Sequence, residues 1–258
     1  MPEPEATVLL DRRDAIAVIT LNRPERRNGV TVEMCRAVYE VVQAVAASDA
    51  RVAILRGSGE HFCVGADIVA ASDGKHETPP APEELGLIHH ASTILHTMPQ
   101  VTIAAIDGGC AGAGMGWAAA CDFRFATPRA RFSTAFLNVG VSGDMGLAWS
   151  LDRIVGGAKA REMLMFPDRF GAEEALRWGL VTRLFEAEDL FDETMVLAGQ
   201  LCERDPFALR MMKANCLSAE HLTMQDFVEI ETARHLHSTN RPDMGARMAS
   251  AFKRSQGK

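Results

Sequence analysis

The sequence predicts an α/β core followed by a C-terminal helical subdomain. In the first half of the chain, short apolar runs typical of buried strands alternate with stretches whose apolar residues recur at helical spacing. Beyond about residue 186 the pattern is helical throughout, and neither a repeat nor a low-complexity tract is found. Alternating elements that lead into a run of helices are typical of this fold class. We place the core at residues 1–190 and the helical region at residues 191–258.

Two strands and a helix open the core. Residues 15–21 (AIAVITL) and 51–57 (RVAILRG) are short, branched apolar runs bounded by turn residues, as buried strands are. Between them, Thr31 is a candidate N-cap. The residues that follow it carry valines at helical spacing, namely Val32, Val38, Val41 or Val42, and Val45. We therefore expect a strand, a helix and a strand in that order.

A loop, a helix and a strand follow. Residues 71–84 (ASDGKHETPPAPEE) mix Ser, Asp and Gly with three prolines, which predicts a mobile loop. We expect a helix from about Glu83 to Thr97 and a strand over residues 101–107. In the C-terminal region, Asp205–Pro206 is a favoured pair of N-cap and first helical residue.

The composition narrows the class of protein. Hydrophobic residues make up 47% of the chain and charged residues 24%, as in ordinary globular proteins. The formal net charge of −7 argues against a nucleic-acid partner. Six cysteines without a CxxC pair indicate reduced thiols rather than a metal site or a disulfide framework. The start of the chain is not a signal peptide and no run approaches the roughly 18 apolar residues of a membrane span, so we expect a cytoplasmic protein with no membrane partner.

Two glycine-containing turns are the strongest functional signal. Residues 108–117 (GGCAGAGMGW) lie between the strand over 101–107 and a helical run, but they contain neither G-x-G-x-x-G nor G-x-x-x-x-G-K-[ST]. One interpretation is close packing of the helix against the sheet. Residues 61–68 (HFCVGADI) also follow a predicted strand. Two such turns could aim two backbone N–H groups at one carbonyl oxygen and so form an oxyanion hole.

These segments resemble those of a known family. Residues 21–29 (LNRPERRNG), 61–68, 102–132 and 171–181 (GAEEALRWGLV), in that order, are similar to the enoyl-CoA hydratase/isomerase, or crotonase, family. The resemblance implies a spiral of repeated β-β-α units, a homotrimer or a hexamer built as a dimer of trimers, and C-terminal helices that serve oligomerisation or act as a lid. It also implies an acyl-CoA thioester substrate, with CoA as part of the substrate and no separate cofactor. The two oxyanion donors fall at Ala66 and Ala113.

The two glutamates of the family's hydratases are absent. By the same resemblance, the first would stand three residues after the second oxyanion donor, where this chain has Gly116. The second would stand four residues after the Phe of ARF, where this chain has Phe136. Neither side chain can move a proton, so the two-glutamate hydration mechanism is not supported.

Asp144 and His89 are the remaining catalytic candidates. Asp144 lies just before an expected helix, so it is either the N-cap of that helix or a catalytic carboxylate. The segment resembles that of the family's 4-chlorobenzoyl-CoA dehalogenases, in which the matching Asp is the nucleophile, a His matches His89, and an active-site Trp matches Phe136. Ala66 stands where those enzymes carry Phe. His89 is either a partner for backbone carbonyls or, if its imidazole reaches the site, a general base.

The resemblance also assigns the groups that hold the substrate. Backbone around the first turn would bind CoA, and Arg26 and Arg27 offer charge for its phosphates. Phe252 could pack on the adenine. The predicted substrate-binding set is Arg26, Arg27, Val64, Ile68, Phe136, Lys213 and Phe252, and no metal site is predicted.

Three functions stay open at this point. The first is an acyl-CoA enzyme in which the oxyanion hole stabilises an enolate while Asp144 alone shuttles a proton, which suffices for double-bond isomerisation. The second is nucleophilic or hydrolytic chemistry, in which Asp144 attacks the acyl group and His89 activates water. The third is a catalytically silent acyl-CoA-binding protein.

Overall fold

The computed structural model describes residues 6–67 and 81–256. Most of the predicted loop over residues 71–84 therefore lies outside the described residues, as does Ile68. The chain divides into two compact units, Met1–Cys202 and Glu203–Lys258, and each is described by itself. The helix α9 (Leu190–Cys202) belongs to the first unit, although the sequence places residues 191–202 with the C-terminal helical region.

A six-stranded sheet forms the centre of the first unit. Its order is β1-β2-β3-β4-β6-β9; β1 runs antiparallel to β2, and the other neighbours are parallel. The strands are β1 (Val8–Arg13), β2 (Ile16–Leu21), β3 (Val52–Gly57), β4 (Val101–Ile106), β6 (Phe123–Ala126) and β9 (Arg183–Leu184). The three predicted strands are confirmed as β2, β3 and β4. Strand β1 was not predicted, because only its first residue is buried and the pattern lacks a continuous apolar run.

The glycine-rich stretch contributes one strand to a second sheet of three short strands. Its order is β5-β7-β8, with β5 (Gly109–Ala111), β7 (Arg131–Ser133) and β8 (Phe170–Gly171). Strand β5 falls inside the stretch that the sequence presents only as a turn. The turn is therefore fixed by pairing to β7 as well as by the helix that follows it.

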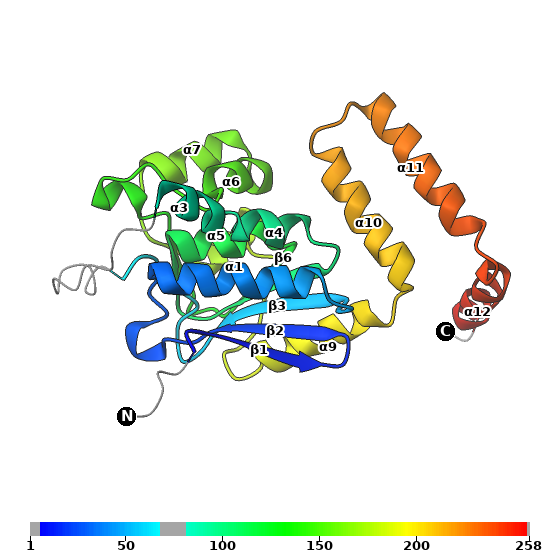
Figure 1. The fold of residues 1–258 in the computed structure, drawn as a ribbon, viewed down its shortest axis with the longest axis horizontal. Helices are drawn as coiled ribbons and strands as arrows, with labels where there is room; N and C mark the ends of the chain where they lie inside the picture. The colour runs from blue at the N-terminus through cyan, green and yellow to red at the C-terminus, as the bar shows by residue number, and fades with distance from the viewer. Residues whose placement is uncertain (1–5, 68–80, 257–258) are drawn as a thin grey trace. The chain divides into compact units, whose positions relative to one another are not determined.

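Helix α1 (Val32–Ala46) packs above the large sheet in the view of Figure 1. The Thr31 hydroxyl accepts a hydrogen bond from the Met34 N–H at 3.2 Å, which confirms the predicted N-cap. Val38, Val42 and Val45 are buried, and Val41 is partly buried against the same core.

The prediction of a single helix from Glu83 to Thr97 is wrong, because the structure has two helices there. They are α3 (Pro82–His89) and α4 (Ala91–Thr97), with His90 between them. The His90 N–H donates to the Leu87 carbonyl at 3.0 Å, three residues back instead of four, which tightens the chain and ends the first helix. His90 is exposed, and the His96 ring packs edge to face on Trp149 with 5.0 Å between centroids.

The other helices and 3-10 turns of the first unit are η1 (Pro24–Arg26), α5 (Ala113–Ala120), η2 (Phe136–Val139), α6 (Leu147–Val155), α7 (Gly157–Met165) and α8 (Ala172–Arg177). All residues of α5 are buried. Helix α5 contacts α4 and α6, and α6 in turn packs on α7, as Figure 1 shows near the top of the first unit. Helix α9 packs against β2, β3, β4 and β6.

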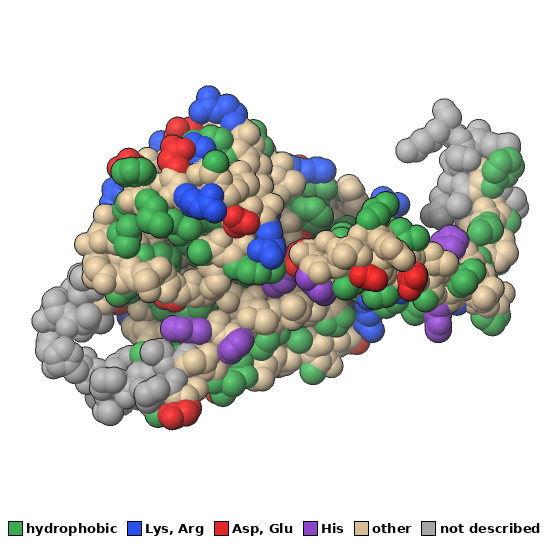
Figure 2. Space-filling model, turned by 90° about the horizontal axis from the view of Figure 1, so that it is seen from above, with side chains coloured by type: hydrophobic (Ala, Val, Ile, Leu, Met, Phe, Trp, Pro, Cys, Tyr) green, Lys and Arg blue, Asp and Glu red, His purple; other side chains and the backbone are tan. Residues whose placement is uncertain are grey.

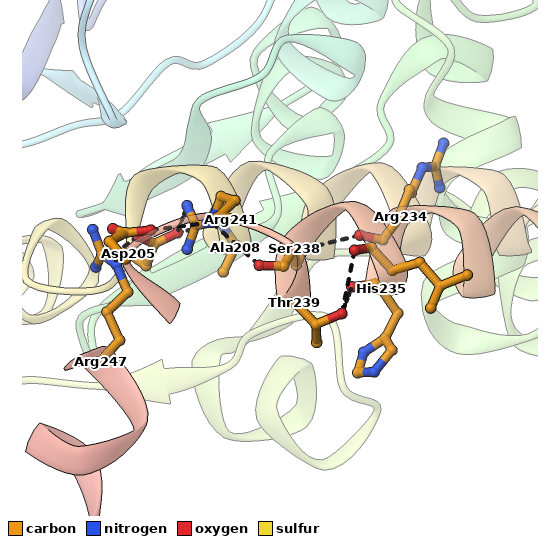
Figure 3. A network of polar contacts seen from close by, with 10 residues as sticks. Asp205, Ala208, Arg234, His235, Ser238, Thr239, Arg241 and Arg247 are labelled. Carbon is orange, nitrogen blue, oxygen red and sulfur yellow. Dashed lines mark hydrogen bonds and ion pairs between the residues drawn. The ribbon is translucent and has the colours of Figure 1, made fainter. Parts of the chain in front are cut away.

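Three helices form the second unit, namely α10 (Pro206–Ala219), α11 (Met224–Thr239) and α12 (Met244–Gln256). Asp205 caps α10 by accepting a hydrogen bond from the Ala208 N–H at 2.8 Å, which confirms the predicted start of this helix. The same carboxylate pairs with Arg241 at 2.9 Å and with Arg247 at 2.7 Å (Figure 3). This network ties the start of α10 to the end of α11 and the start of α12.

The described surface is mixed in character. Figure 2 shows Lys and Arg side chains interspersed with Asp and Glu on one face, with hydrophobic side chains in patches between them. Large exposed hydrophobic side chains of the first unit include Val139, Val141, Met165 and Phe166. Among the helices that the structure describes, none is long and apolar enough to cross a membrane.

Candidate active site

The two turns predicted to form the site lie side by side. Strands β3 and β4 are parallel neighbours, so their carboxyl ends, and the turns that follow, meet at one edge of the sheet. The Cys63 N–H donates to the Gly109 carbonyl at 3.0 Å, and the Ala111 N–H donates to the Cys63 carbonyl at 2.9 Å. The Gly109 N–H also donates to Nδ1 of His61 at 2.9 Å. The turns are thus hydrogen-bonded to each other along their length.

Glycine is needed where the two turns touch. Gly65 has φ +87° and Gly112 has φ +50°, in the region that side chains rarely adopt. A Cβ on Gly65 would lie 3.1 Å from the Ala111 carbonyl oxygen, and a Cβ on Gly112 would lie 3.5 Å from the Gly65 Cα. The two glycines therefore allow the backbones to approach closely.

The residues that follow these glycines present free backbone donors. Ala113 is the first residue of α5, so its N–H has no partner within the helix. Ala66 pairs with Val30, but the bonds of that bridge use the N–H groups of Val30 and Asp67. Neither the Ala66 N–H nor the Ala113 N–H donates to any residue that the structure describes. Two unused donors on adjoining turns, one at a helix N-terminus, are suited to bind a developing oxyanion.

Asn28 fixes the first turn, and sequence reasoning did not single it out. Its buried side-chain amide donates to the carbonyls of Ser58 at 3.0 Å and His61 at 2.8 Å, and its oxygen accepts from the Arg23 N–H at 2.8 Å. Asn28 adopts φ +54°, a left-handed conformation that Asn tolerates. The Asn28–Gly29 dipeptide, a common turn signal, could have drawn attention to it.

Asp67 organises the arginines near the same turn. Its buried carboxylate pairs with Arg23 at 3.0 Å and with Arg26 at 2.7 Å. The charge of Arg26, predicted to face the CoA phosphates, is therefore shared with Asp67. Asp67 therefore helps to fix the shape of the first turn.

Asp144 is not a helix cap. Helix α6 begins after Gly146, and no side chain caps it. The Asp144 Oδ1 atom is buried and has no hydrogen-bond partner among the described residues. Burial raises the pKa of this carboxyl, and the positive charge of His89 lowers it in part. Of the two interpretations of Asp144, the structure removes the one in which its carboxylate caps α6.

His89 lies near Asp144. It is the last residue of α3 and is half-buried, and its charge acts on the Asp144 carboxyl. Its backbone carbonyl accepts a hydrogen bond from the Ser92 hydroxyl at 3.0 Å. The structure therefore brings the two predicted catalytic side chains into one neighbourhood.

Phe136 lies between the second turn and the Asp144 loop. Its buried ring is 3.8 Å from the position of a Cβ on Gly112 and 3.7 Å from that of a Cβ on Gly143. The Phe136 ring thus lies close both to the second turn and to the backbone that leads into Asp144. This position suits a residue that contacts the acyl group.

The thiols beside the turns are not nucleophiles. Cys63 and Cys110 are both fully buried. Burial raises the pKa of Cys63 to about 12, and the negative charge of Asp144 adds to this effect. Burial also raises the pKa of Cys110 well above its usual value. Both side chains are therefore protonated at neutral pH and unreactive.

A groove of about 1180 Å³ reaches the first turn, larger than most small-molecule pockets. It brings together three residues predicted to bind the substrate, Arg26, Arg27 and Val64, with the predicted oxyanion donor Ala66. It does not include Ala113, Asp144, His89 or Phe136. Lys213 is buried and Phe252 is exposed, both in the second unit. No cluster of metal-ligating side chains occurs among the residues described.

Comparison with known proteins gives consistent matches. A family model described as enoyl-CoA hydratase/isomerase matches residues 11–253. The chain is 32% identical to the 1,2-epoxyphenylacetyl-CoA isomerase of Escherichia coli (strain K12), over 84% of each protein. It is 28% identical to 4-chlorobenzoyl coenzyme A dehalogenase-2 of Arthrobacter sp, over 94% of this chain and 89% of that protein. A structure from Thermobifida fusca YX in complex with CoA matches with a TM-score of 0.83 and 25% identity, covering 96% of this chain and 95% of the other. These matches confirm the predicted fold.

Proposed function

Because the chain belongs to the enoyl-CoA hydratase/isomerase (crotonase) family, we propose that it is an enzyme that isomerises an acyl-CoA thioester with a single carboxylate, Asp144. The N–H groups of Ala66 and Ala113 bind the thioester carbonyl oxygen. The observation that carries this proposal is the buried Asp144 Oδ1, which has no hydrogen-bond partner among the described residues, together with the two backbone N–H groups that donate to none of those residues. A buried carboxylate oxygen without a partner is costly in a folded protein, which points to a function.

The chemistry needs one base and one oxyanion hole. Hydrogen bonds to the carbonyl oxygen stabilise the enolate, so the hydrogen on the carbon next to the carbonyl becomes acidic. Asp144 removes that proton, and the electron pair of the C–H bond enters the enolate. The protonated Asp144 then returns the proton to a different carbon as the carbonyl reforms, which moves the double bond without net gain or loss of atoms. The raised pKa of Asp144 makes it a stronger base than an exposed carboxylate.

A second candidate function is nucleophilic. His89 lies close enough to Asp144 to influence its ionisation, and the likeness to a 4-chlorobenzoyl-CoA dehalogenase adds weight to this alternative. In that case Asp144 displaces a leaving group from the acyl moiety to form an ester, and His89 activates the water that hydrolyses it. Phe136 would line the acyl pocket in either mechanism.

The decisive experiment compares thioesters and variants. The purified protein is incubated with unsaturated, aryl and haloaryl CoA thioesters, and products are separated by mass. We expect double-bond migration, lost in Asp144→Asn and unchanged in Asp168→Asn, which removes an exposed carboxylate. Incorporation of ¹⁸O from labelled water into an aryl product, dependent on His89, would favour the nucleophilic alternative. Acyl-CoA binding with no turnover would mark a silent binder, and hydration that survives Asp144→Asn would contradict the single-carboxylate proposal.

The same proposal assigns the binding groups. Arg26, Arg27 and Val64, which line the groove, hold the CoA moiety, and Ile68, outside the described residues, belongs to the same predicted set. Exposed apolar side chains such as Met165 and Phe166 are suited to contacts between copies in the expected homotrimer or hexamer. Lys213 and Phe252 are the candidates from the C-terminal helices, which would serve as oligomerisation or lid elements. The expected setting is the cytoplasm. Arg27→Ala should raise KM for the thioester and leave kcat little changed, because it removes a contact to a remote part of the substrate.

A further inference from the structure

Gly116 is a glycine that its own backbone does not require. It lies in the fourth position of α5 and does not have a positive φ. A Cβ added there would lie 2.5 Å from the Cβ of Met145, closer than real Cβ contacts come. A side chain at position 116 and Met145 in its present position would therefore occupy the same space.

Met145 in turn adopts a backbone conformation that only packing can hold. Its φ is +50°, which is uncommon for a residue with a side chain, and the side chain is buried. Gly143 and Gly146 on either side also have positive φ values, of +113° and +68°. Strained backbone of this kind persists only where the surroundings fix it, and it is frequent at functional sites.

We infer that the contact between Gly116 and Met145 fixes the position of Asp144, so that Met145 is a positioning residue of the active site. The inference rests on the proposed function of Asp144. Because Asp144 immediately precedes Met145, insertion of Met145 against α5 sets the path of the loop that carries the carboxylate. Helix α5 also begins at the Ala113 donor, so one short helix fixes the position of the Asp144 carboxylate relative to the oxyanion hole.

This contact also explains which carboxylate the site can hold. A longer side chain at position 116 would collide with Met145 and displace the Asp144 loop. A carboxylate from α5 and a carboxylate from the loop are therefore mutually exclusive in this packing. The chain has the loop carboxylate, and its acid–base chemistry is restricted to that one group.

The test adds a methyl group at position 116 and then removes the Met145 side chain that this group would meet. In Gly116→Ala, the two Cβ atoms must separate from 2.5 Å to an ordinary contact of about 3.5–4.0 Å, so a crystal structure should show Asp144 displaced by about 1 Å. A misplacement of that size should lower kcat by roughly 10²-fold while KM for the thioester changes little. In Gly116→Ala/Met145→Gly, the new methyl group fills the vacated space, and Asp144 should return to its wild-type position and recover most of the lost kcat. Gly199→Ala in α9 is the matched control, since a Cβ there meets nothing within 4 Å.

Three results would overturn the inference. One is an Asp144 carboxylate that stays in place in Gly116→Ala while α5 moves instead. Another is a Gly116→Ala/Met145→Gly variant whose kcat is no better than that of Gly116→Ala, or failure of both of these variants to fold. The third is a Gly116→Ala enzyme with wild-type kcat. Failure of the proposed function is distinguishable, because it would appear as full turnover in Asp144→Asn, whereas the crystallographic displacement does not depend on turnover.

Discussion

Replacing Asp144 by Asn should make the protein more stable at neutral pH while it abolishes turnover. The Asp144 Oδ1 atom is buried without a hydrogen-bond partner, and burial raises the pKa of the carboxyl. The folded state therefore disfavours the ionised form of this carboxyl. A neutral amide of the same shape removes this cost.

The size of the effect follows from the surroundings of the carboxylate. A buried polar group left without a partner costs about 1–3 kcal/mol, and a charged one costs more. Asp144 is only half-buried and feels the positive charge of His89, and both reduce the cost. We therefore expect Asp144→Asn to increase the free energy of unfolding by about 1–2 kcal/mol. In a unit of this size each 1 kcal/mol raises Tm by about 2–4 °C.

The dependence on pH identifies the cause. A carboxyl whose pKa is raised on folding stabilises the folded state fully only below its unfolded value, about 3.9, and that contribution is lost as the pH rises through the folded value. The Tm difference between Asp144→Asn and the wild type should therefore be largest near pH 7 and disappear toward pH 4. Differential scanning calorimetry from pH 4 to 8 measures it, with Asp168→Asn as the control. A difference that does not change with pH, or a variant less stable than the wild type at pH 7, would refute the reasoning.

Three further predictions concern the turns. Ala113→Pro should lower kcat by about 10²-fold or more with the helix intact, because proline is tolerated at the first helical position but lacks the N–H donor; circular dichroism and kinetics together check this. Asn28→Ala should lower the free energy of unfolding by about 2–3 kcal/mol in urea titrations, because it leaves buried backbone groups unpaired, and a loss below 0.5 kcal/mol would contradict this role. Iodoacetamide at pH 8 should label the exposed Cys216 and not Cys63, whose pKa is raised to about 12 by burial; peptide mass spectrometry reads the result.

Much of the core could be predicted because its signals are local. Continuous apolar runs marked β2, β3 and β4, and valine spacing with Thr31 as the cap marked α1. Strand β1 was missed because it lies at the sheet edge and is mostly exposed, so its sequence carries little periodic signal. The division at His90 depends on a local hydrogen bond that periodicity does not encode.

The parts of the candidate site that a motif fixes, such as the two turns, could be predicted from the sequence. The parts whose position depends on side-chain packing could not. The two glycine turns were placed correctly beside each other, because parallel neighbouring strands bring their ends together. Whether Asp144 caps a helix or is available for catalysis could not be decided from the sequence, because Asp is a favoured N-cap residue. Only the three-dimensional contact between Gly116 and Met145 shows that the missing glutamate side chain leaves no empty space.

The edges of the six-stranded sheet limit how copies of this chain can associate. In the part of the chain that the structure describes, β9 has only two residues, which is too short to template another strand. Strand β1 carries Asp11, Arg12 and Arg13, and the two arginines are held in ion pairs, Arg12 with Asp49 at 2.6 Å and Arg13 with Asp11 at 2.9 Å. Charged edge strands resist backbone pairing between molecules, which is the route to fibrillar aggregation. Any association between copies of this chain is therefore expected to use side-chain surfaces rather than the edges of the six-stranded sheet.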